Sequence, residues 1–505
     1  MKRFDIYFQE ELSRCILCND APCTRACKQL DCASIIRSAR FENYYGAAAM
    51  IAEDFSCASC ENQNCMKVCN RAKLDKAVDI PSIVNFLSDN YKKESLDASN
   101  LPSLEVEFCG VKCENPFVLA SSVISSSYDM CARAFDAGWG GVSVKTINFL
   151  DIKEVSPRFD IHSPNQYPFI GFNNLEQLSQ RSYKDDFKWM KRLRENYPTK
   201  LIISSIMGSN EKEWAMLSKM SQEAGADIIE CNFSCPQMVG ENLGSDVGQN
   251  SEMVKSFTKA CVDAVTIPVI AKLTPNLAAP DGFVRAALDG GAMGIAGINT
   301  VKSITTVEFN SKENGIQGKS AVSGYSGRAV KPIALRFVRD THLSIFKYSN
   351  DDSQFNISGI GGVENWRDAK DFILLGASTV QVCTAVMQYG YRIVEDLKQG
   401  LQVYMKRNNI ESLKYLVARD LFNIREPEHL NRSMLSYPVF ENDRCVSCGR
   451  CYIACQDAGH QAIELSASGH KPVLKVENCV GCHLCRFVCI AGAIGHTEPM
   501  LPKKI

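Results

Sequence analysis

The sequence predicts an α/β fold in which a (β/α)8 barrel lies between two cysteine-rich segments. Eight short β-type runs alternate with helix-like stretches such as 186–195 and 251–265. Several runs are almost wholly apolar, as expected for strands that are covered on both faces. Alternation of this kind favours a TIM-type barrel, with a doubly wound open sheet as the alternative. The runs are 117–121, 141–147, 201–206, 227–235, 268–273, 293–300, 356–360 and 379–385.

Composition limits the classes of partner. A net charge of −1 and a pI of about 6.7 give no reason to expect nucleic acid or an acidic membrane surface as a ligand. No apolar run is long enough to span a bilayer. The first twelve residues, MKRFDIYFQEEL, contain no apolar signal-like core, so we expect a cytoplasmic protein.

The 24 cysteines divide the chain into three zones. Eight lie before residue 70 and eight after residue 444, and a large chain without a signal peptide is expected to use them for metal rather than for disulfides. The first zone contains a predicted helical stretch, Ala33 to Ala52, and ends in a polar segment at 95–100. The predicted domains are 1–100, 101–436 and 437–505.

The C-terminal cysteines repeat the spacing C-x2-C-x2-C-x3-C. This is the bacterial ferredoxin pattern for two [4Fe–4S] clusters, in which each fourth cysteine serves the other cluster. Gln456 and Ile490 replace the proline that usually follows each fourth cysteine. Zinc is the alternative, but it favours separated pairs of ligands. The predicted sets are Cys445, Cys448, Cys451 and Cys489, and Cys479, Cys482, Cys485 and Cys455.

The N-terminal cysteines repeat a second spacing, C-x2-C-x4-C-x3-C. It predicts two more [4Fe–4S] clusters, again with zinc as the alternative. Cys32 is left over and is interpreted as an ordinary thiol. The two quartets are Cys15, Cys18, Cys23 and Cys27, and Cys57, Cys60, Cys65 and Cys69.

Two lysines and two strand ends predict a flavin site in the barrel. Reactive groups in this fold collect at the C-terminal ends of the strands, and the last two loops often bind a phosphate. Here those strands end in 359–363, which is rich in glycine, and in 383–385. Lys145 and Lys272 lie at or in apolar strands, where an unpaired ammonium group is costly. Such a pair suits a cofactor that becomes anionic on reduction, and iron–sulfur clusters require one that converts single electrons into hydride.

The stretch 230–250, ECNFSCPQMVGENLGSDVGQN, ends the fourth strand with polar groups and a thiol. Asn232, Ser234 and Cys235 precede Pro236 and a long polar segment with three glycines. Polar side chains at a strand end under a flexible loop indicate chemistry, whereas a lone cysteine is ordinarily a small buried hydrophobe.

From about Leu104 to its end the chain resembles the pyrimidine-reducing subunit of bacterial dihydropyrimidine dehydrogenases and the last two domains of the animal enzymes. Their barrels belong to the dihydroorotate dehydrogenase-like FMN enzymes. The N-terminal zone resembles the iron–sulfur segment that opens the animal enzymes, but no FAD and NAD(P)H module follows it. The stretches that carry the resemblance are FCGVKCENPF, AGWGGVSVKTI, FIGFNNLEQ, ECNFSCPQM, AKLTPN, INTVKSIT, SGYSGRAVKPIALRF, ISGIGG, GRCYIACQDAGHQAIE, RCILCNDAPCTRAC and FENYYGAAAMI.

The resemblance implies roles for individual residues. Cys235 matches the cysteine that protonates C5 of the pyrimidine while reduced FMN delivers hydride to C6. Residues 237–249 match the mobile active-site loop. The implied substrate contacts are Asn174, Asn232, Ser234, Asn299 and Thr300. The implied FMN contacts are Ser121, Lys145, Thr146, Lys272, Gly324, Ser326, Gly327, Gly361, Gly362, Cys383, Thr384 and Ala385.

One departure concerns the N-terminal clusters. The relatives bind one cluster through three cysteines and a glutamine, and Asn85 stands at the matching position. Asn85 as the last ligand and quartets in sequence order both stay open. The crossed pattern of the relatives gives Cys15, Cys18, Cys23 and Cys69 for one cluster, and Cys27, Cys60 and Cys65 with Cys57 for the other.

The predicted protein is therefore an FMN-binding (β/α)8 barrel with an N-terminal α-helical iron–sulfur domain and a C-terminal ferredoxin-like 2[4Fe–4S] domain. The resemblance implies an oxidoreductase acting on a CH–CH group, which interconverts uracil or thymine with the 5,6-dihydro base. It implies four clusters, a homodimer and an external donor: an FAD and NAD(P)H partner subunit, ferredoxin or flavodoxin. A dihydroorotate dehydrogenase and an electron-transfer subunit without pyrimidine chemistry are the alternatives.

Overall fold

The computed structural model describes residues 6–52, 55, 57, 60–91, 100–161, 169–235, 243–305, 307, 321–349 and 354–502. They form two compact units. One is Cys15–Leu421 and holds N-terminal helices together with the barrel; the other combines Met1–Arg14 with Phe422–Ile505. Within the described ranges no helix is both long and apolar enough to cross a membrane.

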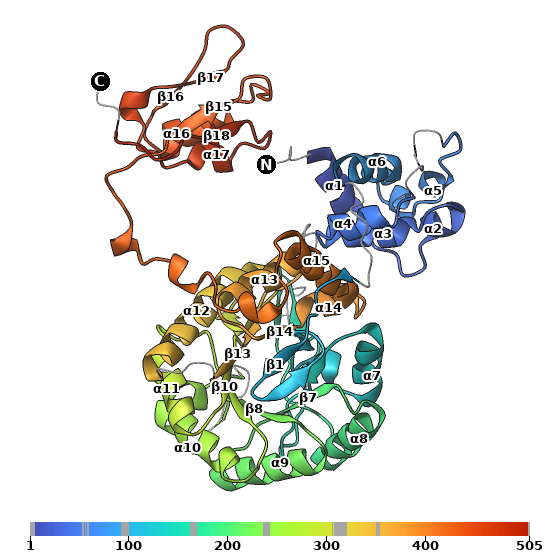
Figure 1. Ribbon diagram of the computed structural model, residues 1–505, viewed down its shortest axis with the longest axis vertical. Coiled ribbons are helices and arrows are strands. Elements are labelled where there is room, and N and C mark those ends of the chain that lie inside the picture. Colours follow the sequence, from blue (N-terminus) through green and yellow to red (C-terminus); the bar gives the residue numbers. More distant parts are fainter. Residues whose placement is uncertain are drawn as a thin grey trace. The chain divides into compact units, whose positions relative to one another are not determined.

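Eight parallel strands close into a barrel in the order β10-β13-β14-β3-β4-β7-β8-β9 (Figure 1). The predicted barrel is confirmed, and the open sheet is wrong because no edge strand is left. All eight predicted runs contain a barrel strand, and every start agrees to within one residue. The strands are β3 (Phe117–Leu119), β4 (Gly141–Ser143), β7 (Leu201–Ile206), β8 (Ile228–Asn232), β9 (Val269–Lys272), β10 (Gly294–Gly297), β13 (Asn356–Ile360) and β14 (Thr379–Val382).

Helices surround the barrel (Figure 1). Several begin at a side chain that accepts a hydrogen bond from the first helical turn, as Ser127, Ser182, Asn210, Asn250 and Asn365 do. The helices are α7 (Tyr128–Ala137), α8 (Tyr183–Asn196), α9 (Glu211–Glu223), α10 (Ser251–Val262), α11 (Asp281–Asp289), α12 (Lys331–Tyr348), α13 (Trp366–Leu374), α14 (Thr384–Tyr389) and α15 (Ile393–Arg407).

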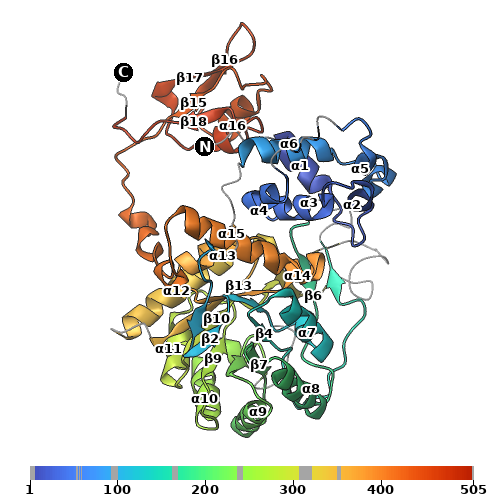
Figure 2. The same ribbon diagram turned by 45° about the vertical axis from the view of Figure 1, so that its right-hand side comes forward.

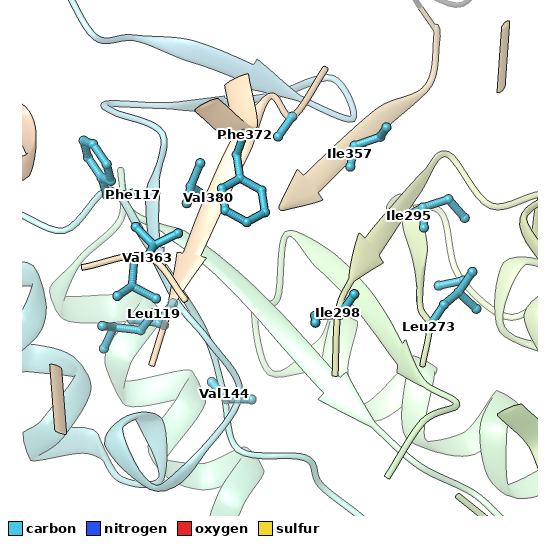
Figure 3. Packing of buried hydrophobic residues seen from close by; sticks show 14 of the residues in the cluster. Phe117, Leu119, Val144, Leu273, Ile295, Ile298, Ile357, Val363, Phe372 and Val380 are labelled. Atoms are coloured by element: carbon cyan, nitrogen blue, oxygen red, sulfur yellow. The ribbon is translucent and has the colours of Figure 1, made fainter. Parts of the chain in front are cut away.

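A hairpin of β1 (Val106–Phe108) and β2 (Val111–Cys113) covers one end of the barrel. The Cys109 N–H donates to the side chain of Asn356, the first residue of β13, so the hairpin lies at the N-terminal ends of the strands. Phe108 is fully buried there against strand residues. A second apolar layer packs the strands against the helices; Figure 3 shows Phe372 of α13 beside Val380 of β14. The C-terminal ends of the strands are left for the site.

A small antiparallel sheet stands over those C-terminal ends. Its order is β11-β12-β6-β5, and Asn174 of β6 pairs with Gly324 of β12. It brings two widely separated loops of the barrel to one place. Its strands are β5 (Phe159–Asp160), β6 (Phe172–Asn174), β11 (Val301–Ser303) and β12 (Ser323–Ser326).

The N-terminal part of the first unit is helical. The helices are α2 (Pro22–Ala26), α3 (Cys32–Arg40), α4 (Tyr44–Ala49), α5 (Asn64–Lys67) and α6 (Ile80–Asn90). The helical stretch predicted from Ala33 to Ala52 is helical but divided in two, as α3 and α4. The backbone of Glu42 has φ 60°, and the Asn43 side chain then accepts the Gly46 N–H at 3.1 Å, so a second helix begins.

Helices α3 and α4 lie beside α15 of the barrel (Figure 2). Buried polar contacts join them to it. The carboxylate of Asp396 on α15 accepts hydrogen bonds from Ser38, Arg37 and Asn43. Phe41 meets the ring of Tyr389, at the end of α14, edge-on at 5.1 Å. Burial raises the pKa of Asp396, and Arg37 opposes that shift. The N-terminal helices are therefore held on the barrel by a buried carboxylate and the donors that satisfy it.

The other unit contains α1 (Ile6–Arg14) and the C-terminal segment. Two antiparallel pairs and two helices form the ferredoxin-like fold that was predicted. Its small core combines Cys451 and Cys485 with Ile463 and Ile494. Its elements are β15 (Pro438–Phe440), α16 (Arg450–Ala458), β16 (Ile463–Leu465), β17 (Pro472–Leu474), α17 (Leu484–Phe487) and β18 (Ile494–His496).

The docking contacts predict a local stability difference. Replacing Asp396 by Ala removes the buried acceptor that Ser38, Asn43 and Arg37 share, which should cost about 3 kcal/mol of opening free energy in α3 and α4. Hydrogen exchange of the amides in these helices measures it. The control is Glu395→Ala, because the ion pair of Arg37 with the half-exposed Glu395 should be worth about 0.5 kcal/mol or less. Equal protection in both variants would contradict the account.

Candidate active site and cluster sites

A cavity opens at the C-terminal ends of the barrel strands and encloses about 1120 Å³ of empty space, counted out to solvent. Most of the predicted substrate and FMN residues line it, although they come from many separate loops. These are Ser121, Lys145, Thr146, Asn174, Asn232, Cys235, Lys272, Asn299, Thr300, Ser326, Gly327, Gly361, Gly362, Cys383, Thr384 and Ala385. The two other predicted residues, Ser234 and Gly324, support this lining from behind through hydrogen bonds.

The predicted substrate residues form a chain of hydrogen bonds. The Asn299 amide donates to Ser234 Oγ at 2.9 Å, and the Asn232 amide donates to Thr146 Oγ1 at 2.9 Å. The Asn174 amide donates to the Gly324 carbonyl at 3.1 Å. Each amide is thereby oriented before any ligand arrives. Thr300 Oγ1 is buried and has no hydrogen-bond partner in the described part of the chain, which leaves it for a ligand.

Cys235 lies where β8 leaves the barrel, beside Asn232 in the wall of the cavity. Its side chain is buried, with 6% of the residue exposed. The predicted mobile loop 237–249 falls partly outside the described residues, which resume at 243. At its described end Val247 is buried, and a Cβ on Gly248 would meet the Phe233 carbonyl at 2.6 Å. That end is packed against Phe233, two residues before Cys235.

Each of the two predicted lysines has a carboxylate partner. Lys145 Nζ pairs with Glu176, which is also bound by Arg158 at 2.8 Å. Lys272 Nζ lies 3.5 Å from Glu230 inside the barrel. Both lysines are buried but paired, so each lies at the edge of the cavity with a carboxylate beside it. Glu230 and Glu176 were missed from the sequence, although a lone carboxylate in the apolar run of β8 is a visible signal.

Three features of the cavity lining fit FMN. Two buried cationic groups suit a ring system that gains negative charge on reduction. Gln381 has a buried Oε1 atom without a partner among the described residues. At Gly361 and Gly362 φ is 127° and 75°, and a Cβ on Gly362 would come within 2.8 Å of Lys331. Only glycine fits there, which leaves backbone N–H groups open to a phosphate.

Two further titratable groups line the same cavity. Burial raises the pKa of Cys383, and the hydrogen bond with Ser122 opposes the shift. Burial raises the pKa of Glu364 to about 7, while Arg328 and Arg40 lower it. Glu364 was not predicted as a site residue. It follows the Gly361–Gly362 turn directly, so its charge will be felt by a phosphate bound there.

The C-terminal cysteines surround two small cavities. Their empty volumes are about 420 Å³ and 340 Å³. Each is lined by three cysteines of one motif and the fourth cysteine of the other, as in the crossed pattern that was predicted. The lining thiols are Cys445, Cys448, Cys451 and Cys489 in the first, and Cys455, Cys479, Cys482 and Cys485 in the second.

The N-terminal thiols also gather in two groups that cross between the motifs. The pKa of Cys23 is raised to about 11, chiefly by burial and further by the charges of Cys15, Cys69 and Cys18. The pKa of Cys57 is also raised to about 11, chiefly by burial and further by the charges of Cys65, Cys27 and Cys60. These neighbourhoods favour the crossed ligand sets over quartets in sequence order, and Cys57 over Asn85. The ligand assignment itself stays a prediction.

Cys32, interpreted from the sequence as an ordinary thiol, lies against a predicted cluster ligand. It is buried and forms a hydrogen bond with Cys65, which lowers the pKa of Cys65 to about 7. The same contact and burial raise the pKa of Cys32. Asn85 lies half-buried on α6. The second N-terminal group is therefore crowded with five thiols: Cys27, Cys32, Cys57, Cys60 and Cys65.

Family models match all three parts of the chain. Residues 103–405 match the dihydroorotate dehydrogenase family. Residues 439–495 match a 4Fe-4S dicluster domain, and residues 5–96 match dihydropyrimidine dehydrogenase domain II, 4Fe-4S cluster. These matches favour iron–sulfur clusters over zinc at both ends.

Curated relatives agree with these matches. The NAD-dependent dihydropyrimidine dehydrogenase subunit PreA of Escherichia coli K12 is 50% identical over 395 residues, covering 77% of this chain and 94% of that protein. The chloroplastic dihydropyrimidine dehydrogenase (NADP(+)) of Arabidopsis thaliana is 37% identical over 335 residues, covering 64% and 78%. The catalytic subunit of dihydroorotate dehydrogenase B (NAD(+)) from Pyrococcus horikoshii is 35% identical over 315 residues, covering 62% and 97%.

A solved structure shares the fold. Ligand-free dihydroorotate dehydrogenase from Eimeria tenella aligns with a TM-score of 0.53 at 19% identity, over 67% of this chain and 98% of that one. At that identity the similarity concerns the barrel fold alone.

Glu364 predicts a pH dependence of flavin binding. Burial raises its pKa to about 7, so the folded protein favours the neutral carboxyl. The stability that the neutral form contributes is present at lower pH and is lost as pH rises through 7. The ionised carboxylate should repel the phosphate of FMN. The dissociation constant of FMN should therefore rise about threefold or more between pH 6 and 8. Equilibrium dialysis measures it.

Glu364→Gln is the matched control, because it keeps the shape and removes the titration. Its pH dependence should be limited to that of the FMN phosphate, whose second pKa is about 6. Identical slopes in the wild type and the variant would contradict a role for Glu364.

Proposed function

The chain belongs to the dihydroorotate dehydrogenase family, in the branch of the dihydropyrimidine dehydrogenases, and we propose that it interconverts uracil or thymine with the 5,6-dihydro base. The observation that carries the proposal is the meeting of Cys235 with oriented amides in one cavity above two paired lysines. The two segments with cysteine motifs and the barrel supply the parts that such a reaction needs.

The amide groups suit a pyrimidine base. Each edge of uracil presents carbonyl acceptors and N–H donors, and an asparagine side chain offers one of each. Asn174, Asn232 and Asn299 are held by hydrogen bonds to neighbouring groups, so few rotamers are lost on binding. The unpartnered Thr300 Oγ1 adds a further donor or acceptor.

The chemical step needs one hydride and one proton. When bound, FMN supplies the hydride to C6 of the ring. The thiol of Cys235 is proposed to donate its proton to C5 and to regain one from solvent afterwards. Because Cys235 is buried, its proton would reach the base without competition from bulk water. Lys145 and Lys272 would stabilise negative charge that develops in the cofactor ring.

The charges of the cavity favour a base over orotate. Orotate carries a carboxylate that needs a cation beside the amides. Among the described cations of the lining, Lys145 is paired with Glu176 and Lys272 with Glu230, and Arg328 lies near enough to Glu364 to lower its pKa. Both lysines therefore already have a carboxylate partner, whereas a neutral base needs no cation.

Electrons are proposed to enter through the N-terminal clusters, pass the C-terminal pair and reach the flavin. The donor is proposed to be an FAD and NAD(P)H partner subunit, with ferredoxin or flavodoxin as alternatives. The name of the E. coli relative, a subunit of an NAD-dependent enzyme, supports the first of these. A head-to-tail homodimer would bring the two sets of clusters together.

Cys235→Ala tests the proposed function. Anaerobic protein reduced by an artificial one-electron donor should consume uracil or thymine. The loss of pyrimidine absorbance measures this consumption. The variant should be slower by about 100-fold to 10,000-fold, because it lacks the proton donor. FMN content should be unchanged, since the thiol holds a proton and not the cofactor.

Cys231→Ala is the matched control. Cys231 lies on β8, four residues before Cys235, but its thiol is buried against Cys261 of α10 at 3.5 Å and does not line the cavity. It should retain pyrimidine turnover. Turnover of orotate alone would favour a dihydroorotate dehydrogenase, and flavin oxidation without consumption of any pyrimidine would favour an electron-transfer subunit.

A further inference from the structure

A carboxylate hidden behind the cavity organises groups that line it. Glu230 lies on β8 with none of its surface exposed. Ser143 Oγ donates to its Oε1 atom at 3.1 Å, and Gln381 Nε2 donates to its Oε2 atom at 3.0 Å. Lys272 Nζ stands 3.5 Å from Oε1. Four strands, β4, β8, β9 and β14, thus converge on one buried charge.

The network has a hidden layer and a layer that faces the cavity. Lys272 and Gln381 line the cavity, whereas Glu230 and Ser143 do not. A ligand would therefore touch the lysine and the glutamine, and Glu230 would act only through them. Lys145 differs, because its partner Glu176 is itself part of the lining.

Glu230 decides which end of the Gln381 amide faces the ligand. A carboxylate accepts only, so the Gln381 NH2 group must point toward it and the amide oxygen must point away. That oxygen is buried and has no hydrogen-bond partner in the described part of the structure, and the residue is 1% exposed. A buried acceptor without a partner is costly unless a ligand supplies an N–H or O–H group. FMN carries both kinds of donor.

Packing alone does not account for the network. A buried ion pair generally stabilises a fold no better than apolar side chains of equal volume. The rest of the barrel interior holds apolar side chains, among them Ile203, Ile228 and Ile270, and small hydroxyl side chains such as Ser205, Ser358 and Thr379, but no other buried carboxylate among the described strand residues. A carboxylate, a lysine and a glutamine in that position therefore indicate a function at the cavity that they adjoin.

We propose that Glu230 is a positioning residue of the flavin site. It holds the Lys272 ammonium group and aims the Gln381 oxygen at the cofactor. Its negative charge also offsets part of the lysine's attraction for negative charge on the reduced ring, and so sets the relative affinity for oxidised and reduced FMN. The inference rests on the proposed function only for the identity of the cofactor.

The test compares FMN dissociation constants of oxidised and reduced protein by equilibrium dialysis, which does not depend on cluster absorbance. In Glu230→Gln, the ratio of oxidised to reduced dissociation constants should rise about tenfold, since Lys272 loses its counter-charge. For a two-electron couple this equals a shift of about +30 mV in the bound flavin. In Gln381→Leu both constants should rise about tenfold and their ratio should stay the same, because only an acceptor is lost.

A second background separates positioning from general damage. If Glu230 acts through Lys272, Glu230→Gln should leave the ratio unchanged in Lys272→Met protein. An equal rise in both backgrounds, or an unchanged ratio in the single variant, would overturn the proposal. If Glu230→Gln does not fold, Glu230→Asp and Ser143→Ala carry the test, because they weaken the same contacts with smaller changes. An unchanged ratio in both of these would also overturn it.

The outcomes also separate this inference from the proposed function. A changed ratio in protein that never consumes uracil would support the role of Glu230 and reject the pyrimidine chemistry. An unchanged ratio in protein that reduces uracil normally would reject the role of Glu230 and support the pyrimidine chemistry.

Discussion

The site depends on the burial of two ammonium groups at the mouth of an apolar barrel. A buried lysine is tolerated only with a counter-charge close by, and the two lysines obtain theirs from opposite directions: Lys145 from Glu176 in the cavity wall, and Lys272 from Glu230 in the barrel interior. These pairs place two cationic groups in the wall of the cavity. A cofactor that becomes more negative during turnover is stabilised there without rearrangement of the protein.

The rest of the fold keeps this mouth rigid and the opposite end closed. The hairpin β1–β2 covers the N-terminal ends of the strands, and the cavity opens at the opposite end, where the lysines lie. The antiparallel sheet over the C-terminal ends fixes Asn174 against Gly324. Helices α3 and α4 pack on α15 through Asp396, and Phe41 reaches Tyr389 at the end of α14. An iron–sulfur segment is thus attached next to the helix that begins at Thr384 in the cavity wall.

Sequence patterns predicted the barrel, the lysines and the strand-end cysteine because each depends on residues close in the chain. Strand starts were accurate to one residue, but predicted ends ran on by up to four, since apolar composition continues past the last ladder hydrogen bond into the site loops. The partner of Lys272 was missed because it depends on register: β8 pairs Asn232 with Lys272, which brings Glu230 to the lysine diagonally. The break at Glu42 was missed although Asn43 is a residue typical of helix starts. Docking of α3 on Asp396 joins residues more than 350 positions apart, and no local pattern encodes it.

The central claim is that electrons stored in this one chain reduce a pyrimidine at the Cys235 cavity. The most direct measurement reduces the anaerobic protein fully, removes the reductant, and mixes it with uracil while product is counted. Four clusters that hold one electron each and a flavin that holds two should form up to about three dihydrouracil molecules per chain. More than one product per flavin, with bleaching of the clusters reversed in step, is the predicted result. Fully reduced protein that retains its electrons in the presence of uracil and thymine would contradict the account.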